Sequence, residues 1–346
     1  RETHRRGIFV QIELWDRFDF TDNNGANHWQ THPYNPCNNV NYSYDESGFA
    51  AAYPDHPCAN KQPFFFTTPA QHNNQTVLHY QQRFVDKVLD HSLAYDHVLY
   101  CMDNETSGEE AWSRYWATYV TQRAAREHRH VQVTEMWDDW ELTAERHART
   151  FDHPELYHFV DVSQNNMQRG QQHWDNFQYV RARLASQPRP INTIKTYGAD
   201  GNKYGHTNQD GIERFWRHVL AGAACARFHR PPAGLGLNDT AVACIRAARK
   251  LESLMPLWTL APANELVIDR APNQVYAASD GQRALALYLP CGGTLRLALA
   301  RMAGTLTVRW IDISTGEWGN TQRVPAGACV PLTAPGNGNW AAALTI

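Results

Sequence analysis

The sequence predicts an α/β fold, a (β/α)8 TIM-type barrel followed by a small antiparallel β-sandwich. Apolar runs of strand length alternate with helical patterns through the first three quarters of the chain, which is typical of βα units. Short alternating segments separated by turn residues fill the last quarter. We therefore expect a barrel domain over residues 1–262 and a sandwich domain over residues 263–346, which fits the two domains expected for 346 residues.

The expected strands follow from apolar runs of four to eight residues. In the barrel domain these runs cover residues 8–15, 98–102, 131–136, 159–162, 191–197 and 223–228. Helical periodicity separates them at residues 77–93, 108–128, 171–185 and 210–221. Ser107 and Glu110 have the spacing of a capping box at the start of the second of these helices. In the last quarter the expected strands are residues 266–268, 275–278, 284–289, 294–299, 306–312, 328–332 and 340–346.

The pair Asn104-Glu105 directly follows a buried-strand pattern and precedes a helix. Barrel enzymes keep their chemistry at the C-terminal ends of the strands, so a carboxylate at this position can face a bound substrate. The alternative is that Glu105 pairs with a basic side chain at the barrel rim. An Asn-Glu pair alone is a weak signal, and its position after a strand gives it meaning.

These motifs resemble the large glycoside hydrolase clan of (β/α)8 barrels whose fourth strand ends in Asn-Glu. The closer likeness is to the DUF4038 group of apiosidase-like enzymes, in which a small C-terminal module is labelled collagen-binding. Residues 7–17 resemble that group's third strand, residues 80–105 its third helix and fourth strand, and residues 264–266 and 310–316 its C-terminal module. The resemblance implies that Glu105 is the acid/base of a glycosidase and that Asn104 holds the sugar's 2-hydroxyl. For the C-terminal module we expect a structural role.

The match of residues 7–17 to a third strand implies that the chain as given lacks the first two strands of the barrel. Such a barrel exposes a strand edge, which predicts self-association through that edge. The alternative is that two strands lie within residues 16–76, a long segment rich in Asn, Pro, Gly and Tyr. We expect this segment to overhang the site, where its aromatic residues either contact sugar or pack against the barrel top; they are Trp29, Tyr34, Tyr42 and Tyr53.

Glycoside hydrolysis normally requires two carboxylates, and the second carboxylate is the harder one to identify in this sequence. The resemblance places a Glu at the end of the seventh strand, where this sequence has Lys195. A lysine does not form the usual glycosyl ester, so a retaining mechanism is not supported there. Glu135 is the preferred replacement, with a structural ion pair to Lys195 or Arg169 as the alternative, and Asp138, Asp161 and Asp16 are other carboxylates at strand ends.

Further polar and aromatic residues lie at the expected strand ends, where hydroxyls of a sugar need hydrogen-bond partners and apolar ring faces. The expected substrate-binding residues are Asn104, Asp16, Trp15, Trp137, Asp138, Gln164, Asn165, Lys195, Tyr197 and His229.

Composition narrows the classes of function. The net charge of -3 and the absence of charge blocks predict no nucleic-acid partner, and no apolar run is long enough to span a membrane. None of the seven cysteines has C-x-x-C spacing, and we expect neither a metal nor a cofactor. Cys37 and Cys58 lie in one Pro/Asn-rich stretch, where a disulfide fits a secreted or periplasmic protein.

Two functions from different classes remain open on the sequence alone. The first is a glycoside hydrolase that acts on plant or microbial polysaccharide. The second is a non-catalytic carbohydrate-binding protein on a degenerate barrel, which Lys195 and the absent strands favour.

Overall fold

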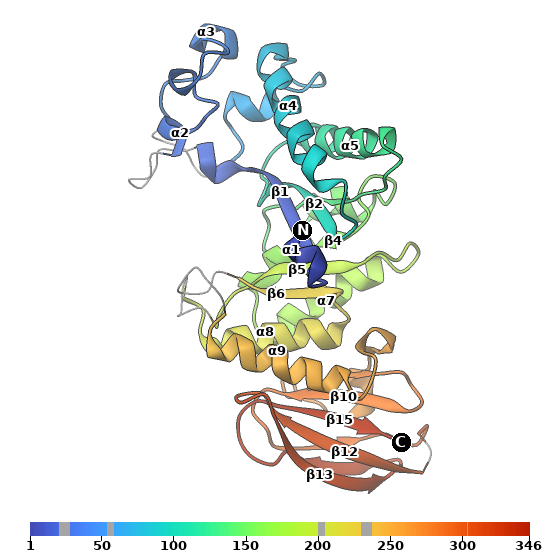
Figure 1. The fold of residues 1–346 in the computed structure, drawn as a ribbon. Coiled ribbons are helices and arrows are strands. Elements are labelled where there is room, and N and C mark those ends of the chain that lie inside the picture. Colours follow the sequence, from blue (N-terminus) through green and yellow to red (C-terminus); the bar gives the residue numbers. More distant parts are fainter. Residues whose placement is uncertain (21–27, 54–58, 200–204, 230–236, 303) are drawn as a thin grey trace. The chain divides into compact units, whose positions relative to one another are not determined.

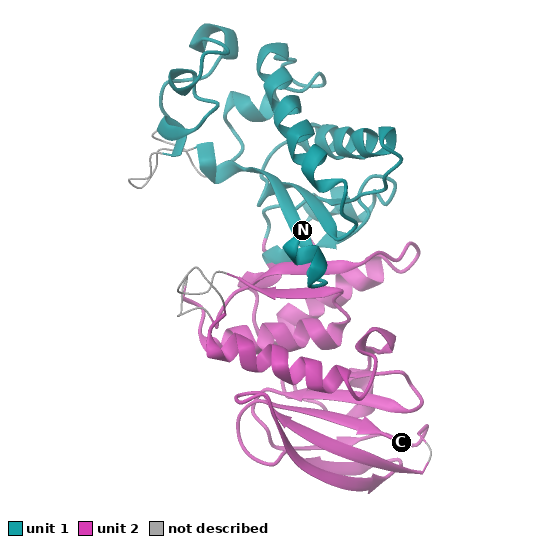
Figure 2. Ribbon diagram, in the orientation of Figure 1, with its two compact units in different colours: residues 1–139, 144–164 teal, residues 140–143, 165–346 magenta. Residues whose placement is uncertain are grey.

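The computed structural model describes residues 1–20, 28–53, 59–199, 205–229, 237–302 and 304–346. The chain divides into two compact units, drawn in teal and magenta in Figure 2. The first contains residues 1–139 and 144–164, and the second contains residues 140–143 and 165–346. Cys58 lies outside the described residues, so the expected bridge to Cys37 stays a prediction.

The first unit is built on a parallel sheet with the order β1-β2-β3 (Figure 1). These strands are Val10–Asp16, Val98–Asn104 and Gln132–Thr134, and each overlaps a segment expected as a strand, the first two ending one and two residues later than expected. Helix α4 (Gln75–Ser92) precedes β2 and helix α5 (Glu110–Arg126) precedes β3. The unit also contains α1 (Glu2–Arg5), α6 (Glu145–Phe151) and the short strand β4 (Val160–Asp161). This order of strands and helices is that of βα units.

Short helices make up the long segment between β1 and α4. They are η1 (Arg17–Phe20), α2 (His28–Thr31), η3 (Pro36–Asn38), α3 (Tyr44–Ser47) and η4 (Pro63–Phe66), and the described residues of this segment contain no strand. Trp29 is fully buried and Tyr42 nearly so, in one core with Trp15, Phe64 and Trp112. For Trp29 and Tyr42 the structure therefore shows packing rather than a sugar-facing surface, because aromatic rings are also ordinary core material.

The start of α5 differs from the sequence prediction. The helix begins at Glu110, and its N-cap is Glu109, which makes no side-chain capping bond. The capping box expected from Ser107 and Glu110 is therefore wrong. The Ser107 hydroxyl instead accepts a hydrogen bond from the backbone N–H of Asn60 at 3.1 Å, because the fold brings that distant loop against the end of β2.

The 3-10 helix η5 (Ser163–Met167) leads into the second unit, which continues the alternation. Strands β5 (Ile191–Thr196) and β6 (Cys225–Phe228) pair in parallel. The expected helices are present as α7 (Gly170–Arg183) and α8 (Asn208–Ala221), and a further helix, α9 (Asp239–Glu252), follows β6.

Two antiparallel sheets complete the second unit. One has the order β13-β12-β15-β10-β9-β7, and the other has the order β14-β11-β8. Both contribute side chains to a single hydrophobic core, and helices α8 and α9 lie against the six-stranded sheet (Figure 1). The elements are η7 (Leu257–Thr259), β7 (Ala261–Pro262), η8 (Asn264–Leu266), β8 (Val267–Ile268), β9 (Tyr276–Ser279), β10 (Ala284–Leu289), β11 (Thr294–Leu297), β12 (Thr305–Asp312), β13 (Glu317–Pro325), β14 (Val330–Thr333) and β15 (Trp340–Thr345). All seven segments expected as strands here contain one, and β7 and β13 were not expected.

Candidate active site

The parallel register brings three strand ends of the first unit to one edge of the sheet. Asp16 at the end of β1 lies opposite Asn104 at the end of β2. Beyond β2 and β3 the chains stay paired, since the Thr106 N–H donates to the Met136 carbonyl at 2.7 Å and the Asp138 N–H donates to the Thr106 carbonyl at 2.8 Å. Glu105 and Asp138 are therefore neighbours across this extension, at the edge where α/β enzymes bind their substrates.

Arg17 connects the carboxylates of Glu105 and Asp138. Its Nη2 lies 3.8 Å from Glu105 Oε2, and its Nη1 donates to Asp138 Oδ2 at 2.8 Å. The guanidinium side chain is only 7% exposed, whereas the two carboxylates are 17% and 28% exposed. Glu105 thus has the basic partner that the alternative reading expected at the rim. Sequence reasoning did not select Arg17, although its place directly after a strand-ending Asp16 was a usable signal.

The backbone at Glu105 is unusual. Its φ of 50° lies in the left-handed region, which a non-glycine residue rarely occupies. Such a conformation costs about 1–3 kcal/mol and persists where the surrounding structure imposes it, often at functional sites. Here the surrounding structure includes the β-bridge between Thr106 and Trp137, which begins directly after Glu105.

Glu135 lies inside the protein, with none of its surface exposed. Its Oε1 accepts hydrogen bonds from the backbone N–H groups of Asp103 at 3.0 Å and Met136 at 2.9 Å. Burial raises the pKa of Glu135 to about 7, and these two hydrogen bonds oppose that rise. The side chain therefore joins the ends of β2 and β3 from within.

Asp103 is a second fully buried carboxyl group in this region. Burial raises its pKa well above the ordinary range, and the nearby Glu135 raises it further. The Asn60 amide donates to Asp103 Oδ2 at 2.5 Å and accepts from the Ser107 N–H at 2.8 Å. Asn60 thus fastens the loop before η4 to the end of β2, a role that no local sequence signal indicated.

The other expected site residues of the first unit vary in exposure. Trp15 and Trp137 are core residues, 5% and 1% exposed, and the Trp137 indole donates to Thr150 Oγ1 at 2.8 Å. Asp16 is half-buried and accepts a hydrogen bond from the Phe18 N–H at 3.0 Å. Asn104 and Gln164 are both buried. The structure therefore brings Asp16, Asn104, Glu105 and Asp138 to one edge of the sheet.

The remaining expected site residues belong to the second unit. Lys195 is buried in β5, and Asn165 is buried with its amide donating to the His173 carbonyl at 2.8 Å. The Tyr197 ring lies 5.1 Å from the His229 ring, and the His229 N–H donates to the Thr196 carbonyl at 3.1 Å. Tyr197 and His229 therefore form a pair of rings just beyond the end of β5.

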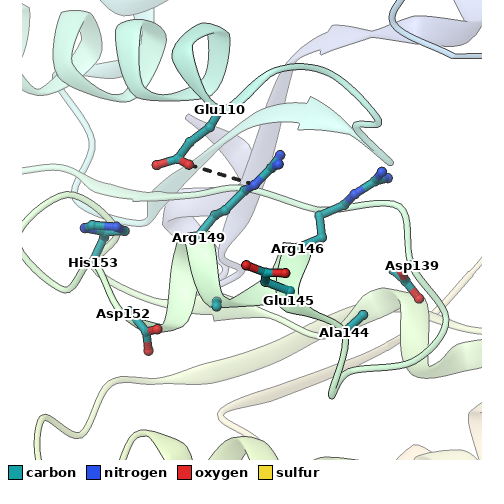
Figure 3. A pocket seen from close by; sticks show the side chains of 9 residues that line it. Glu110, Asp139, Ala144, Glu145, Arg146, Arg149, Asp152 and His153 are labelled. Carbon is teal, nitrogen blue, oxygen red and sulfur yellow. Dashed lines mark ion pairs between the residues drawn. The ribbon is translucent and has the colours of Figure 1, made fainter.

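A polar cavity of about 620 Å³ lies beside the loop that carries Asp138 (Figure 3). Glu110 of α5 faces Arg149 of α6 across it, with 3.9 Å between Arg149 Nε and Glu110 Oε2. The Arg146 guanidinium group, which also lines the cavity, donates to the Asp138 carbonyl at 3.1 Å. Glu105 and the Asp138 side chain are not among the lining residues. The cavity is therefore a neighbour of the candidate site, and four acidic side chains but only two arginines line it.

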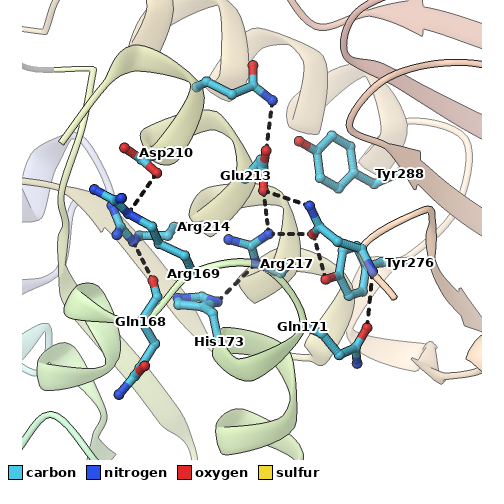
Figure 4. Close-up of polar contacts among 12 residues, drawn as sticks. Gln168, Arg169, Gln171, His173, Asp210, Glu213, Arg214, Arg217, Tyr276 and Tyr288 are labelled. Atoms are coloured by element: carbon cyan, nitrogen blue, oxygen red, sulfur yellow. Dashed lines mark hydrogen bonds and ion pairs between the residues drawn. The ribbon is translucent and has the colours of Figure 1, made fainter. Parts of the chain in front are cut away.

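A buried polar network in the second unit joins α7 and α8 to the antiparallel strands (Figure 4). Arg217 of α8 is 1% exposed and donates to Glu213 Oε2 at 2.7 Å and to His173 Nδ1 at 3.2 Å. It also donates to Asn273 Oδ1 at 3.0 Å, which in turn accepts from the Tyr276 hydroxyl. Burial lowers the pKa of His173 well below its ordinary value, so this ring is neutral. The arrangement is that of a satisfied structural ion pair.

Solved structures share this fold. A glycoside hydrolase has a TM-score of 0.59 at 11% sequence identity, over 78% of this chain and 71% of that chain. An α-amylase from Geobacillus thermoleovorans, complexed with acarbose, has a TM-score of 0.56 at 8% identity, over 100% and 79% of the two chains. A glycoside hydrolase family 5 protein from Bacteroides vulgatus has a TM-score of 0.54 at 12% identity, over 76% of this chain and 66% of its own.

These similarities are of fold alone, because all three identities are low. No protein-family model matches the chain, and no curated protein matches it. Within the described residues, no helix is both long and apolar enough to cross a membrane. The chain therefore has a mixed α/β fold that solved glycoside hydrolases also adopt.

Proposed function

We propose that this chain is a glycoside hydrolase of plant or microbial polysaccharide, secreted or periplasmic, on a (β/α)8-type barrel followed by a β-sandwich. Glu105 is the general acid/base and Asp138 is the second carboxylate. The observation that carries the proposal is the contact of both carboxylates with the single guanidinium group of Arg17. The fold shared with solved glycoside hydrolases supports it.

The separation of the two carboxylates suits this chemistry. Contacts of 3.8 Å and 2.8 Å to one guanidinium group keep the carboxylates near each other. They are thus within the roughly 9.5 Å that two-carboxylate glycosidases use. The stereochemical outcome depends on whether the gap admits a water molecule, as in inverting enzymes, or is closer to about 5 Å, as in retaining ones.

The two contacts with Arg17 also suggest how the roles divide. Asp138 accepts a direct, charge-assisted hydrogen bond at 2.8 Å, and we assign it the role of base or nucleophile. Glu105, whose Oε2 lies 3.8 Å from the same group, is the proposed proton donor to the leaving oxygen, which is the role that the resemblance implies for it. Asn104, adjacent in sequence and buried, is the proposed partner of the sugar's 2-hydroxyl.

This assignment replaces Glu135 by Asp138 as the second carboxylate. Glu135 is fully buried and bound to two backbone N–H groups, which leaves it no route to an attacking water. Asp138 is partly exposed. The narrower resemblance to the DUF4038 group, with its C-terminal module, remains part of the proposal.

The test is release of reducing sugar from a panel of plant and microbial polysaccharides. We expect activity on at least one substrate from the unmodified chain and from Glu109→Gln, which changes an exposed carboxylate near the site. The matched variant Glu105→Gln should be inactive in the same preparation. Activity that survives in Glu105→Gln would refute the assignment of the acid/base.

A non-catalytic carbohydrate-binding protein is the second candidate. It is favoured by Lys195, which is buried in β5 at the position where the resemblance places a catalytic Glu. Polysaccharide binding without any turnover, equal in the unmodified chain and in Glu105→Gln, would support this second function.

A further inference from the structure

A cluster of metal-ligand side chains lies at the other end of the sheet from Glu105. His4 belongs to α1, and Asp96 and His97 directly precede β2. One ligand atom from each of these residues lies within 4.8 Å of the other two. Since β2 has seven residues at about 3.3 Å each, the cluster is roughly 20 Å from the candidate active site. It is therefore separate from the proposed chemistry.

The spacing of the ligand atoms matches a single small ion. His4 Nδ1 lies 3.2 Å from His97 Nδ1 and 3.6 Å from Asp96 Oδ1. Two ligands on a tetrahedral zinc ion, at bond lengths near 2.0–2.1 Å, are separated by about 3.3 Å. The two distances from His4 Nδ1 are thus near those that coordination requires, and the third, between Asp96 and His97, is at most 4.8 Å.

The second ring nitrogen of His97 has the partner that a metal-bound histidine needs. Its Nε2 lies 3.0 Å from Thr3 Oγ1, and the ring is largely buried. When Nε2–H donates to this hydroxyl, the lone pair of Nδ1 faces His4 and Asp96. Outer-shell hydrogen bonds of this kind fix the tautomer and the ring orientation of histidine ligands.

The charges around the cluster are compatible with a cation. Asp96 supplies a negative charge, and the positive charges of Arg5 and Arg6 are both paired with Glu2. Two imidazoles and a carboxylate are also a donor set that suits zinc and other late first-row metals.

We propose that His4, Asp96 and His97 bind one divalent transition-metal ion, Zn²⁺ by preference, with water in the fourth position. The ion ties α1 to the start of β2, next to the hydrogen bond from the Val10 N–H to the His97 carbonyl. Its role is structural, because the site is remote from Glu105. This differs from the sequence-based expectation of no metal. His4 lies 92 residues before Asp96, and the adjacent pair Asp96-His97 does not have the spacing of a zinc motif.

The competing reading is a hydrogen bond between the two imidazoles, with Nδ1–H of His4 donating to Nδ1 of His97. That reading predicts no uptake of metal. The full chain, stripped with a chelator and titrated with Zn²⁺ by calorimetry, distinguishes the two. We expect one ion per chain and a higher melting temperature in excess Zn²⁺.

Variants locate the site. His4→Ala and Asp96→Asn change exposed side chains, so both should fold and both should lose the bound ion. Thr3→Val should weaken binding about tenfold, as loss of an outer-shell partner does. His79→Ala, which alters an exposed histidine of α4, is the matched control and should bind like the unmodified chain. Absence of zinc binding, or binding that His4→Ala and Asp96→Asn leave intact, would overturn the proposal.

Discussion

The backbone N–H of Asp103 donates to Oε1 of Glu135 at 3.0 Å, so a side chain that follows β3 is bound to the main chain of β2. The same oxygen accepts from Met136, and the carboxyl group is sealed from solvent. Burial makes this carboxyl group keep its proton to a higher pH than a free one, although the two hydrogen bonds act in the opposite direction. This relationship makes the stability of the protein depend on pH.

We predict that Glu135 contributes stability that is lost as pH rises through the window from 4.5 to about 7. The buried histidines His173 and His218, whose pKa values burial lowers, contribute with the opposite sign in the lower part of this window. In this window the unfolded chain ionises Glu135, whereas the folded chain retains the proton because burial raises its pKa. The contribution of Glu135 to the free energy of unfolding should therefore be larger on the acid side, with a slope of at most about 1.4 kcal/mol per pH unit. Urea unfolding of the unmodified chain and of Glu135→Gln at about pH 5, 6, 7 and 8 measures this slope by difference.

The variant Glu135→Gln should reduce that slope, since the amide cannot titrate but still accepts the two backbone hydrogen bonds. Asp103, whose pKa burial also raises, keeps a slope of the same sign. The control Glu109→Gln should retain the full slope. Identical slopes in Glu135→Gln and the unmodified chain would show that Glu135 does not titrate in this window.

Glu105→Gln should lower turnover by about a hundredfold or more on substrates with poor leaving groups, because it removes the proton donor while it keeps size and polarity. Binding of the polysaccharide should change little. Substrates with activated leaving groups need less acid assistance, so their first step should be slowed less. Equal losses on both kinds of substrate would contradict the role of acid.

Asp138→Asn should also lower turnover by about a hundredfold or more, since it removes the carboxylate that activates water or attacks the sugar. Glu135→Gln is the informative comparison, because it alters the buried carboxyl group beneath the same strand ends. If Glu135→Gln loses turnover and Asp138→Asn keeps it, Glu135 is the second carboxylate and the assignment to Asp138 is wrong.

Arg17→Met should destabilise the protein by about 1–3 kcal/mol, since it removes the hydrogen bond to Asp138 and the positive charge beside Glu105. Turnover should fall by a larger factor than the substrate affinity, because Arg17 positions both carboxylates. Arg17→Lys keeps the positive charge, but lysine lacks the planar guanidinium group that contacts both carboxylates. The stability of this variant should therefore be closer to that of the unmodified chain than its turnover is. Full turnover in Arg17→Met would show that the contact is structural.

Asn60→Ala should cost about 1–3 kcal/mol, because Asp103 Oδ2 and the Ser107 N–H both lose their partner inside the protein. The matched control is Asn41→Ala, at an exposed asparagine of the same long segment, and it should change the free energy of unfolding by less than about 0.5 kcal/mol. Equal effects of the two variants would rule out a specific role for Asn60.

The sequence by itself determined where the buried strands and four of the long helices lie, whereas helix α9 was not expected. All six apolar runs expected as parallel strands contain a strand, and β10 has the expected bounds of 284–289. These elements bury one face or both, so their hydrophobic pattern is local information. β13 was missed because this edge strand is largely exposed and has no alternating pattern to read.

Only the tertiary structure decided what the polar residues do. The S-x-x-E pattern at Ser107 was a reasonable local signal, but Asn60, 47 residues away, binds that serine. The joint contact of Glu105 and Asp138 with Arg17 requires the parallel register of β1 and β2 and the bridge beyond β2 and β3. Burial of Glu135 and exposure of Asp138, three residues apart, follow from the path of the chain after β3. The sequence pattern around a polar side chain does not indicate its partner, because these hydrogen bonds and ion pairs are made between segments distant in sequence.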